Sequence, residues 1–220
     1  NIGEFIIKIN NRKVLNGFFA SLNLSSKITD ILRTIDKIDK IGKEAVKLEL
    51  MKLDISEDNS NKILEFIAIT GSNDEILKKL VSLNIENKTF NEGISELKQV
   101  TEYLKAFNVP EENFNINLTI ARGLDYYTGT VYETNLVKYP ELGSICSGGR
   151  YENLTEYYTK QKLPGIGISI GLTRLFSQLK DIGLLDEEDE NKSITKVLVM
   201  DIDNKDFSYM LKVATAFRES

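Results

Sequence analysis

The stretch that decides the fold is Ala121–Glu133, which reads ARGLDYYTGTVYE. It brings an arginine, two adjacent tyrosines and glycines into a region where apolar and polar residues alternate, beginning with Phe114, Ile116 and Leu118. Alternation with a period of two predicts strands. A strand that carries charge, aromatic rings and glycine favours the floor of a ligand site over the inside of a core. We therefore expect a β-rich section over residues 114–171.

Two more glycine-bearing blocks follow in that section. Ser144–Leu154 reads SICSGGRYENL, and Pro164–Leu175 reads PGIGISIGLTRL. The glycines of the second block lack the G-x-G-x-x-G spacing of a dinucleotide-binding turn, and the Ile-Ser-Ile between them is a strand pattern. We expect turns at residues 139–140 and 148–149, and a helix over residues 172–182.

Upstream of this section the spacing of apolar residues is mostly helical. We expect a strand over residues 5–9, then a short helix reaching residue 22, with a turn signal at Asn16-Gly17. Further helices are expected around residues 28–38, 45–51, 63–67, 76–83 and 94–107.

Polar residues mark where some of these helices are expected to begin and end. Residues 54–60 predict a polar loop, and Ser72, Asn73 and Asp74 are candidate caps for the helix that follows. Beyond an acidic run, residues 197–200 predict a buried strand and residues 209–218 an amphipathic helix.

Composition excludes several classes of function. The 220 residues contain no histidine, so the chain alone cannot supply Ser-His-Asp or Cys-His catalysis or a histidine-containing zinc site. The single cysteine, Cys146, rules out an internal disulfide and fits a reducing compartment, and we interpret it as a small strand or turn residue rather than a reactive thiol. The net charge of −5 argues against bulk attraction to nucleic acid, although a local patch can still bind one. No apolar run approaches the ~18 residues of a membrane span, and the chain does not open with a signal peptide.

The three blocks resemble, in order and spacing, the signatures of histidyl-tRNA synthetases, class II ligases that activate histidine with ATP. Ala121–Glu133 is similar to the first histidine-site signature, Ser144–Leu154 to the second, and Pro164–Leu175 to class II motif 3. The resemblance implies an α/β (α+β) fold, with a mainly antiparallel class II catalytic sheet and flanking helices. It divides the chain into catalytic core over 1–25, helical insertion domain over 26–108, catalytic core again over 109–185, acidic linker over 186–194, and the start of an α/β anticodon-binding domain over 195–220.

The resemblance assigns the reacting end of the site to the first signature. Arg122 would bind histidine and act as the catalytic group. Negative charge develops on the α-phosphate during adenylation, and a guanidinium stabilises this charge with two hydrogen bonds. Tyr126 and Tyr127 would bind the imidazole through their hydroxyls. Neighbouring strand residues face opposite ways, so both tyrosines reach one pocket only if the strand twists or bulges at Gly129. Without the family pattern, such residues would be a surface ion pair and core aromatics.

Glycines and a second arginine complete the set that the resemblance implies. Gly148 and Gly149 would contact histidine through their backbone, although the same dipeptide also suits a plain turn. Gly171 and Arg174 would bind ATP, with the arginine against the adenine and the γ-phosphate.

Other polar residues have weaker claims. Thr130 and Glu133 share the strand of the first signature and are expected to support it, and no metal ligand is expected. Four lysines recur at helical spacing among acidic residues, which favours a solvated face over an RNA surface; they are Lys37, Lys40, Lys43 and Lys47. The resemblance nonetheless places the insertion domain near the acceptor stem of tRNA.

The implied reaction joins L-histidine to the 3′ end of tRNA(His) through histidyl-adenylate, with ATP as substrate. Mg²⁺ would be held mainly by ATP, without a tightly bound cofactor. The resemblance implies a cytoplasmic homodimer without membrane contact for the full-length protein. Motif 1, motif 2 and the acidic partner of the imidazole have no counterpart, so we expect these 220 residues to be incomplete and inactive alone. Two alternatives stay open: a non-catalytic, histidine-sensing regulatory subunit of the first enzyme of histidine biosynthesis, and a synthetase-like RNA-binding regulatory domain.

Overall fold

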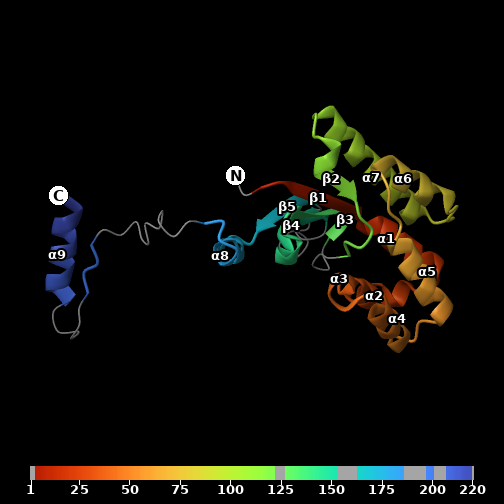
Figure 1. Cartoon of the computed structure of the whole chain (residues 1–220), viewed down its shortest axis with the longest axis horizontal. Helices are drawn as coiled ribbons and strands as arrows, with labels where there is room; N and C mark the ends of the chain where they lie inside the picture. Colours follow the sequence, from red (N-terminus) through yellow and green to blue (C-terminus); the bar gives the residue numbers. More distant parts are fainter. Residues whose placement is uncertain (1–2, 122–126, 153–162, 186–196, 201–206, 220) are drawn as a thin grey trace. The chain divides into compact units, whose positions relative to one another are not determined.

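The computed structural model describes residues 3–121, 127–152, 163–185, 197–200 and 207–219 (Figure 1). Arg122, Tyr126 and the acidic linker expected over 186–194 lie outside the described residues. The chain divides into two compact units, residues 1–176 and residues 177–220.

The first unit is built on a sheet whose strand order is β2-β1-β3-β4-β5. Strand β1 (Phe5–Asn11) pairs in parallel with the short β2 (Phe114–Ile116). The next neighbours, β3 (Tyr127–Leu136), β4 (Ser144–Tyr151) and β5 (Gly165–Ile170), are antiparallel. The mainly antiparallel sheet expected from the sequence is therefore confirmed.

Helices occupy most of the chain between β1 and β2 (Figure 1). They are α1 (Arg12–Ser21), α2 (Ile28–Ile35), α3 (Ile38–Ile41), α4 (Lys43–Lys52), α5 (Glu57–Ile67), α6 (Asn73–Ser82) and α7 (Lys88–Ala106). Single 3₁₀ turns are η1 (Ser25–Lys27), η2 (Glu111–Asn113) and η3 (Pro140–Leu142). Helix α8 (Leu172–Asp181) follows β5, and α9 (Phe207–Glu219) belongs to the second unit.

One hydrophobic cluster joins these helices to the sheet. Phe19 of α1, Leu50 of α4, Phe90 of α7 and Phe114 of β2 are all at most 1% exposed. Helix α1 packs against α7, and α7 also contacts β1 and β3. The helical region thus shares its core with one face of the sheet.

Several local expectations are wrong for identifiable physical reasons. Asn16 and Gly17 lie inside α1 rather than in a turn, because Gly17 is where the backbone of Phe90 approaches; a Cβ on Gly17 would overlap it. The polar loop ends at Ser56, whose side chain accepts from the backbone N–H of Asn59 (3.2 Å) and begins α5 at Glu57. The helix expected over 28–38 is broken between α2 and α3.

A turn and a strand expected from the sequence also need correction. Gly148 and Gly149 are internal residues of β4, not a turn. Residues 197–200 have no regular secondary structure, and Val197, Leu198 and Met200 are exposed. A strand needs partners for its backbone hydrogen bonds, and no described strand pairs with this segment.

Other expectations are confirmed. Ser72 caps α6: its side chain accepts from the backbone N–H of Glu75, whose carboxylate accepts from the N–H of Ser72, a full capping box. A helix starts at Leu172 as expected, and α9 covers the predicted amphipathic segment. Among the described residues, no helix is long and apolar enough to cross a membrane.

Candidate active-site floor

The sheet gathers the described candidate residues onto neighbouring strands. Arg122 and Tyr126 are not described, but they directly precede the start of β3 in the chain. The others are Tyr127, Thr130 and Glu133 on β3, Gly148 and Gly149 on β4, and Gly171 and Arg174 after β5.

The register places part of this set on one side of the sheet. Gly149 is paired with Val131 on β3 and with Gly167 on β5. Tyr127 is paired with Tyr151, which in turn is paired with Gly165. Glu133 is paired with Ser147, two residues from Gly149 and hence on the same side. We call this side the signature face and define it by Tyr127, Glu133, Gly149, Tyr151 and Gly167.

Glycines let two tyrosine rings lie against the backbone of the signature face. A Cβ on Gly149 would come within 2.9 Å of Cδ1 of Tyr127. A Cβ on Gly165 would overlap the ring of Tyr151, and one on Gly167 would lie 3.4 Å from that ring. Larger residues at these positions would lift the rings away. The arrangement gives a half-buried aromatic floor that carries hydroxyl groups, as expected for a ligand site.

The pairing of β3 with β4 is irregular next to Tyr127. The register shifts between Tyr127 and Val131, a stretch that contains Gly129. A Cβ on Gly129 would lie 3.1 Å from Cδ of Arg150, so the irregular segment packs closely against β4. The strand is therefore irregular around Gly129, where the sequence analysis considered a twist or bulge.

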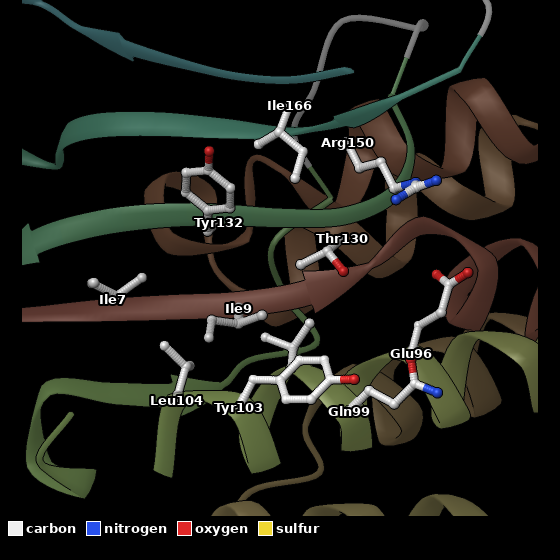
Figure 2. Close-up of a pocket in the computed structure, with 11 residues that line it drawn as sticks. Ile7, Ile9, Glu96, Gln99, Tyr103, Leu104, Thr130, Tyr132, Arg150 and Ile166 are labelled. Carbon is white, nitrogen blue, oxygen red and sulfur yellow. The ribbon is translucent and has the colours of Figure 1, made fainter. Parts of the chain in front are cut away.

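Thr130 and Gly148 belong to the opposite side of the sheet. There a cavity of about 630 Å³ lies between α7 and the strands, lined by Glu96 and Tyr103 from α7 and by Ile9, Thr130 and Arg150 from the sheet (Figure 2). Its lining is mainly apolar. This cavity thus lies on the side of the sheet opposite to the signature face.

Gly148 has a packing role on that opposite side. The hydroxyl of Tyr132 donates to the carbonyl oxygen of Gly167 (2.9 Å) and so connects β3 to β5 across β4. A Cβ on Gly148 would lie 2.7 Å from this hydroxyl oxygen. The side chain of Tyr132 therefore requires glycine at position 148, and of the two candidate glycines only Gly149 shares a side with Tyr127.

Gly171 and Arg174 lie at the far end of the floor from Tyr127. Strand β5 runs from Gly165, paired with Tyr151, to Ile170, paired with Cys146, a span of about 17 Å at ~3.4 Å per residue. The carbonyl of Gly171 accepts from the N–H of Leu175 and opens α8. The guanidinium of Arg174 donates through Nη2 to the carbonyl of Leu142 (2.8 Å) and is otherwise largely exposed.

Two titratable groups on the side of the sheet opposite to the signature face have shifted pKa values. Burial raises the pKa of the Cys146 thiol, which disfavours the reactive thiolate. Burial also raises the pKa of the Tyr132 hydroxyl, which stays a neutral donor. Within the described ranges, no group of three or more His, Cys, Asp or Glu side chains could hold a metal ion.

Sequence reasoning missed two features of the site. Tyr151 was not among the candidate site residues, yet its ring covers two glycines of β5. Its alternation with Gly149 along β4 was the signal that places both on one side. Asn10 and Arg12, buried polar residues near the start of the first signature, gave no comparable signal, because their partners are backbone carbonyls more than 100 residues away.

Comparisons with known proteins agree with one family. The sequence model of the family described as histidyl-tRNA synthetase matches residues 1–175. A histidine–tRNA ligase of Clostridium tetani is 52% identical over 217 residues, which are 99% of this chain and 49% of that protein. The crystal structure of histidyl-tRNA synthetase from Nostoc sp. superposes with a TM-score of 0.83 at 47% identity, covering 100% of this chain and 51% of that one.

A more distant structure shares the fold alone. A protein from Bacillus halodurans described as an ATP phosphoribosyltransferase regulatory subunit/histidyl-tRNA synthetase has a TM-score of 0.65 at 19% identity, covering 81% of this chain and 45% of that one. The chain spans about half the length of the curated relatives that it matches.

Proposed function

The chain belongs to the histidyl-tRNA synthetase family, and from this premise we propose that it carries part of the active site of a histidine–tRNA ligase. The full-length protein would convert L-histidine and ATP to histidyl-adenylate and then transfer the histidine to the 3′ end of tRNA(His). The observation that carries the proposal is the signature face: Tyr127 begins β3 directly after the Arg122–Tyr126 segment and lies against Gly149 of the second signature.

Each candidate residue has a proposed role on that floor. Arg122 would bind the histidine carboxylate and the α-phosphate, where its two parallel N–H groups offset the charge that develops during adenylation. Tyr126 and Tyr127 would bind the imidazole, whose two nitrogens are one donor and one acceptor when neutral. Gly149, whose lack of a side chain makes room for the ring of Tyr127 on the signature face, would contact the amino acid through its backbone.

The nucleotide would occupy the other end of the floor. Arg174 and Gly171 lie past the end of β5, about 17 Å of strand away from Tyr127 at ~3.4 Å per residue. An adenylate has its amino acid and its adenine at opposite ends, so this separation suits it. Arg174 would exchange its bond to Leu142 for adenine and the γ-phosphate. Mg²⁺, held mainly by ATP, would screen its phosphates.

The remaining expectations are parts of the same proposal. Residues 26–108 would form the insertion that approaches the acceptor stem, between the catalytic segments 1–25 and 109–185. Residues 186–194 would link this core to an anticodon-binding domain that starts at 195. The full-length protein would be a cytoplasmic homodimer.

Histidine-dependent exchange of pyrophosphate into ATP tests the proposal directly. The full-length protein that contains this sequence should exchange pyrophosphate with histidine, and not with other amino acids, and should charge tRNA(His). The 220-residue chain assayed at the same concentration should be inactive, because it carries Arg122 and Arg174 but no motif 2 arginine. Absence of histidine-dependent exchange in the full-length protein would refute the function, and comparable exchange by the 220 residues would refute the assignment of the missing groups.

A further inference from the structure

Two side chains from the junction of β1 and α1 hold the backbone that leads into the first signature. The side-chain amide of Asn10 donates through Nδ2 to the carbonyls of Leu118 (3.3 Å) and Ile120 (2.9 Å). The guanidinium of Arg12 donates through Nη1 to the carbonyl of Ala121 (2.8 Å). The next residue in the chain is Arg122.

This contact is buried on both sides. Asn10 is 0% exposed and Arg12 is 6% exposed. Leu118, Ile120 and Ala121 are themselves at most 5% exposed. Buried amides and guanidinium groups are retained when their hydrogen bonds are made, and buried backbone carbonyls need donors in the same way. The two polar side chains therefore define where residues 118–121 run.

The energetics of α1 do not explain an arginine at its first position. A cation at a helix N-terminus opposes the helix dipole, and arginine is rarely buried without a partner. Capping is already provided by Asn11, whose side chain accepts from the N–H of Lys13 (2.9 Å) and donates to Glu96 of α7 (2.7 Å). Asn11 therefore caps the helix, whereas Asn10 and Arg12 bind the backbone of residues 118–121, which are distant in the sequence.

We propose that Arg12 and Asn10 are positioning residues for the histidine site. They fix the chain up to Ala121, the residue that directly precedes Arg122 in the sequence. Neither side chain needs to touch histidine or ATP. A displacement of a catalytic group by about 1 Å can lower the rate ~100-fold, so a residue that holds such a group in place can have a large effect on kcat. The inference rests on the function proposed above.

Steady-state pyrophosphate exchange by the full-length protein that contains this sequence tests the inference. Arg12→Ala should lower kcat by about 10- to 100-fold while the KM values for histidine and ATP change less than about threefold, because the substrate contacts other than those of Arg122 stay in place. Methylguanidinium, which fits the space vacated by the side chain, should restore part of kcat. Arg12→Lys keeps one donor but loses the planar fork, and should fall between the two.

Arg33→Ala is the matched control. Arg33 lies on α2, its side chain is 67% exposed, and it pairs with Asp30 at 3.9 Å. Its removal takes away the same charge and should leave kcat, KM and the response to methylguanidinium unchanged.

The outcomes separate the two proposals. If the unsubstituted protein shows no histidine-dependent exchange, the function itself is wrong. If it is active and folded Arg12→Ala has a normal kcat, or has a reduced kcat that methylguanidinium does not restore, the positioning role alone is overturned. If Arg12→Ala does not fold, Arg12→Lys decides: a reduced kcat at unchanged KM supports the role, and a normal kcat overturns it.

Discussion

The helical region and the β5 edge of the sheet use apolar residues in opposite ways. In the helices, Phe19 and Phe90 are at most 1% exposed and belong to the cluster that also packs on the sheet. In β5, Ile166, Ile168 and Ile170 are 70%, 66% and 59% exposed. The helical region buries its apolar side chains in a core that it shares with the sheet, whereas strand β5 leaves apolar side chains in solvent and the strands of the floor place glycines and tyrosines on the signature face. Stability is therefore concentrated in the first region and recognition in the second.

Substitutions should separate these two properties. A change in the helical core should lower the free energy of unfolding and leave the activity of each folded molecule unaltered. A change on the floor should lower activity in the full-length protein with little effect on unfolding. A pair of variants that broke this division would show that the core and the floor are coupled.

The largest expected effect is Phe90→Ala in the helical core. Phe90 is 1% exposed, lies close to Phe66 (ring centroids 6.3 Å apart) and packs beside Gly17. Removing its ring leaves a cavity and should lower the free energy of unfolding by about 3–5 kcal/mol in urea titration. The matched control is Phe107→Ala, at the end of the same helix but 81% exposed, which should change it by less than ~0.5 kcal/mol. Equal losses for the two variants would contradict a closed helical core.

Arg122→Ala should produce the largest effect on the floor. Loss of a fixed charge opposite the α-phosphate should slow histidine-dependent pyrophosphate exchange of the full-length protein by about 10²–10³-fold, with a smaller effect on histidine affinity. The midpoint of urea unfolding should stay unchanged. Near-normal exchange would remove Arg122 from the reacting end of the site.

Tyr127→Phe should have a smaller effect on the same floor. If the Tyr127 hydroxyl binds an imidazole nitrogen, its removal leaves that nitrogen unpaired and weakens histidine binding by about 1–3 kcal/mol, measured by calorimetry on the full-length protein. A ring analogue of histidine without that nitrogen should bind both proteins alike. Tyr103→Phe is the control, because Tyr103 is 63% exposed and lines the cavity on the side of the sheet opposite to the signature face. Unchanged discrimination between histidine and the analogue would argue against the contact.

The same division explains what the sequence could predict. Helices α6 and α7 were predicted because their signals are local: the capping box at Ser72 and the repeat of apolar residues that ends at Ala106. Gly17 and Gly148 were wrongly predicted to lie in turns. Each position needs glycine because a residue from another element packs against it. Phe90 approaches the first across the packing of two helices, and Tyr132 covers the second from the next strand. Such long-range contacts leave no mark in the surrounding sequence.

The candidate site was predicted in part for a related reason. The family resemblance identified the residues of the first signature, and the two-residue alternation predicted the strands that carry them. The choice between Gly149 and Gly148, and the side on which Thr130 lies, depend on the register of β3 against β4, which shifts at the bulge around Gly129. A shift in register moves side chains between faces, and the amino-acid pattern alone does not fix it.

The smallest expected effect on stability is that of Ile168→Thr in β5, the strand whose apolar side chains are exposed. Threonine keeps the strand preference of a β-branched residue, and Ile168 is already 66% exposed, so the free energy of unfolding should change by less than about 0.5 kcal/mol. The exposed row Ile166, Ile168 and Ile170 should nevertheless make the 220-residue chain self-associate, because contiguous apolar surface on an edge strand favours association. Sedimentation velocity over a range of concentrations should therefore find a smaller associated fraction for Ile168→Thr than for the unsubstituted chain. Ser169→Thr, on the opposite side of the same strand, should behave like the unsubstituted chain. If the chain stays monomeric at every concentration, the exposed row is covered within the chain. The contrast between the buried helical core and the exposed strand β5 is then smaller than the exposed fractions indicate.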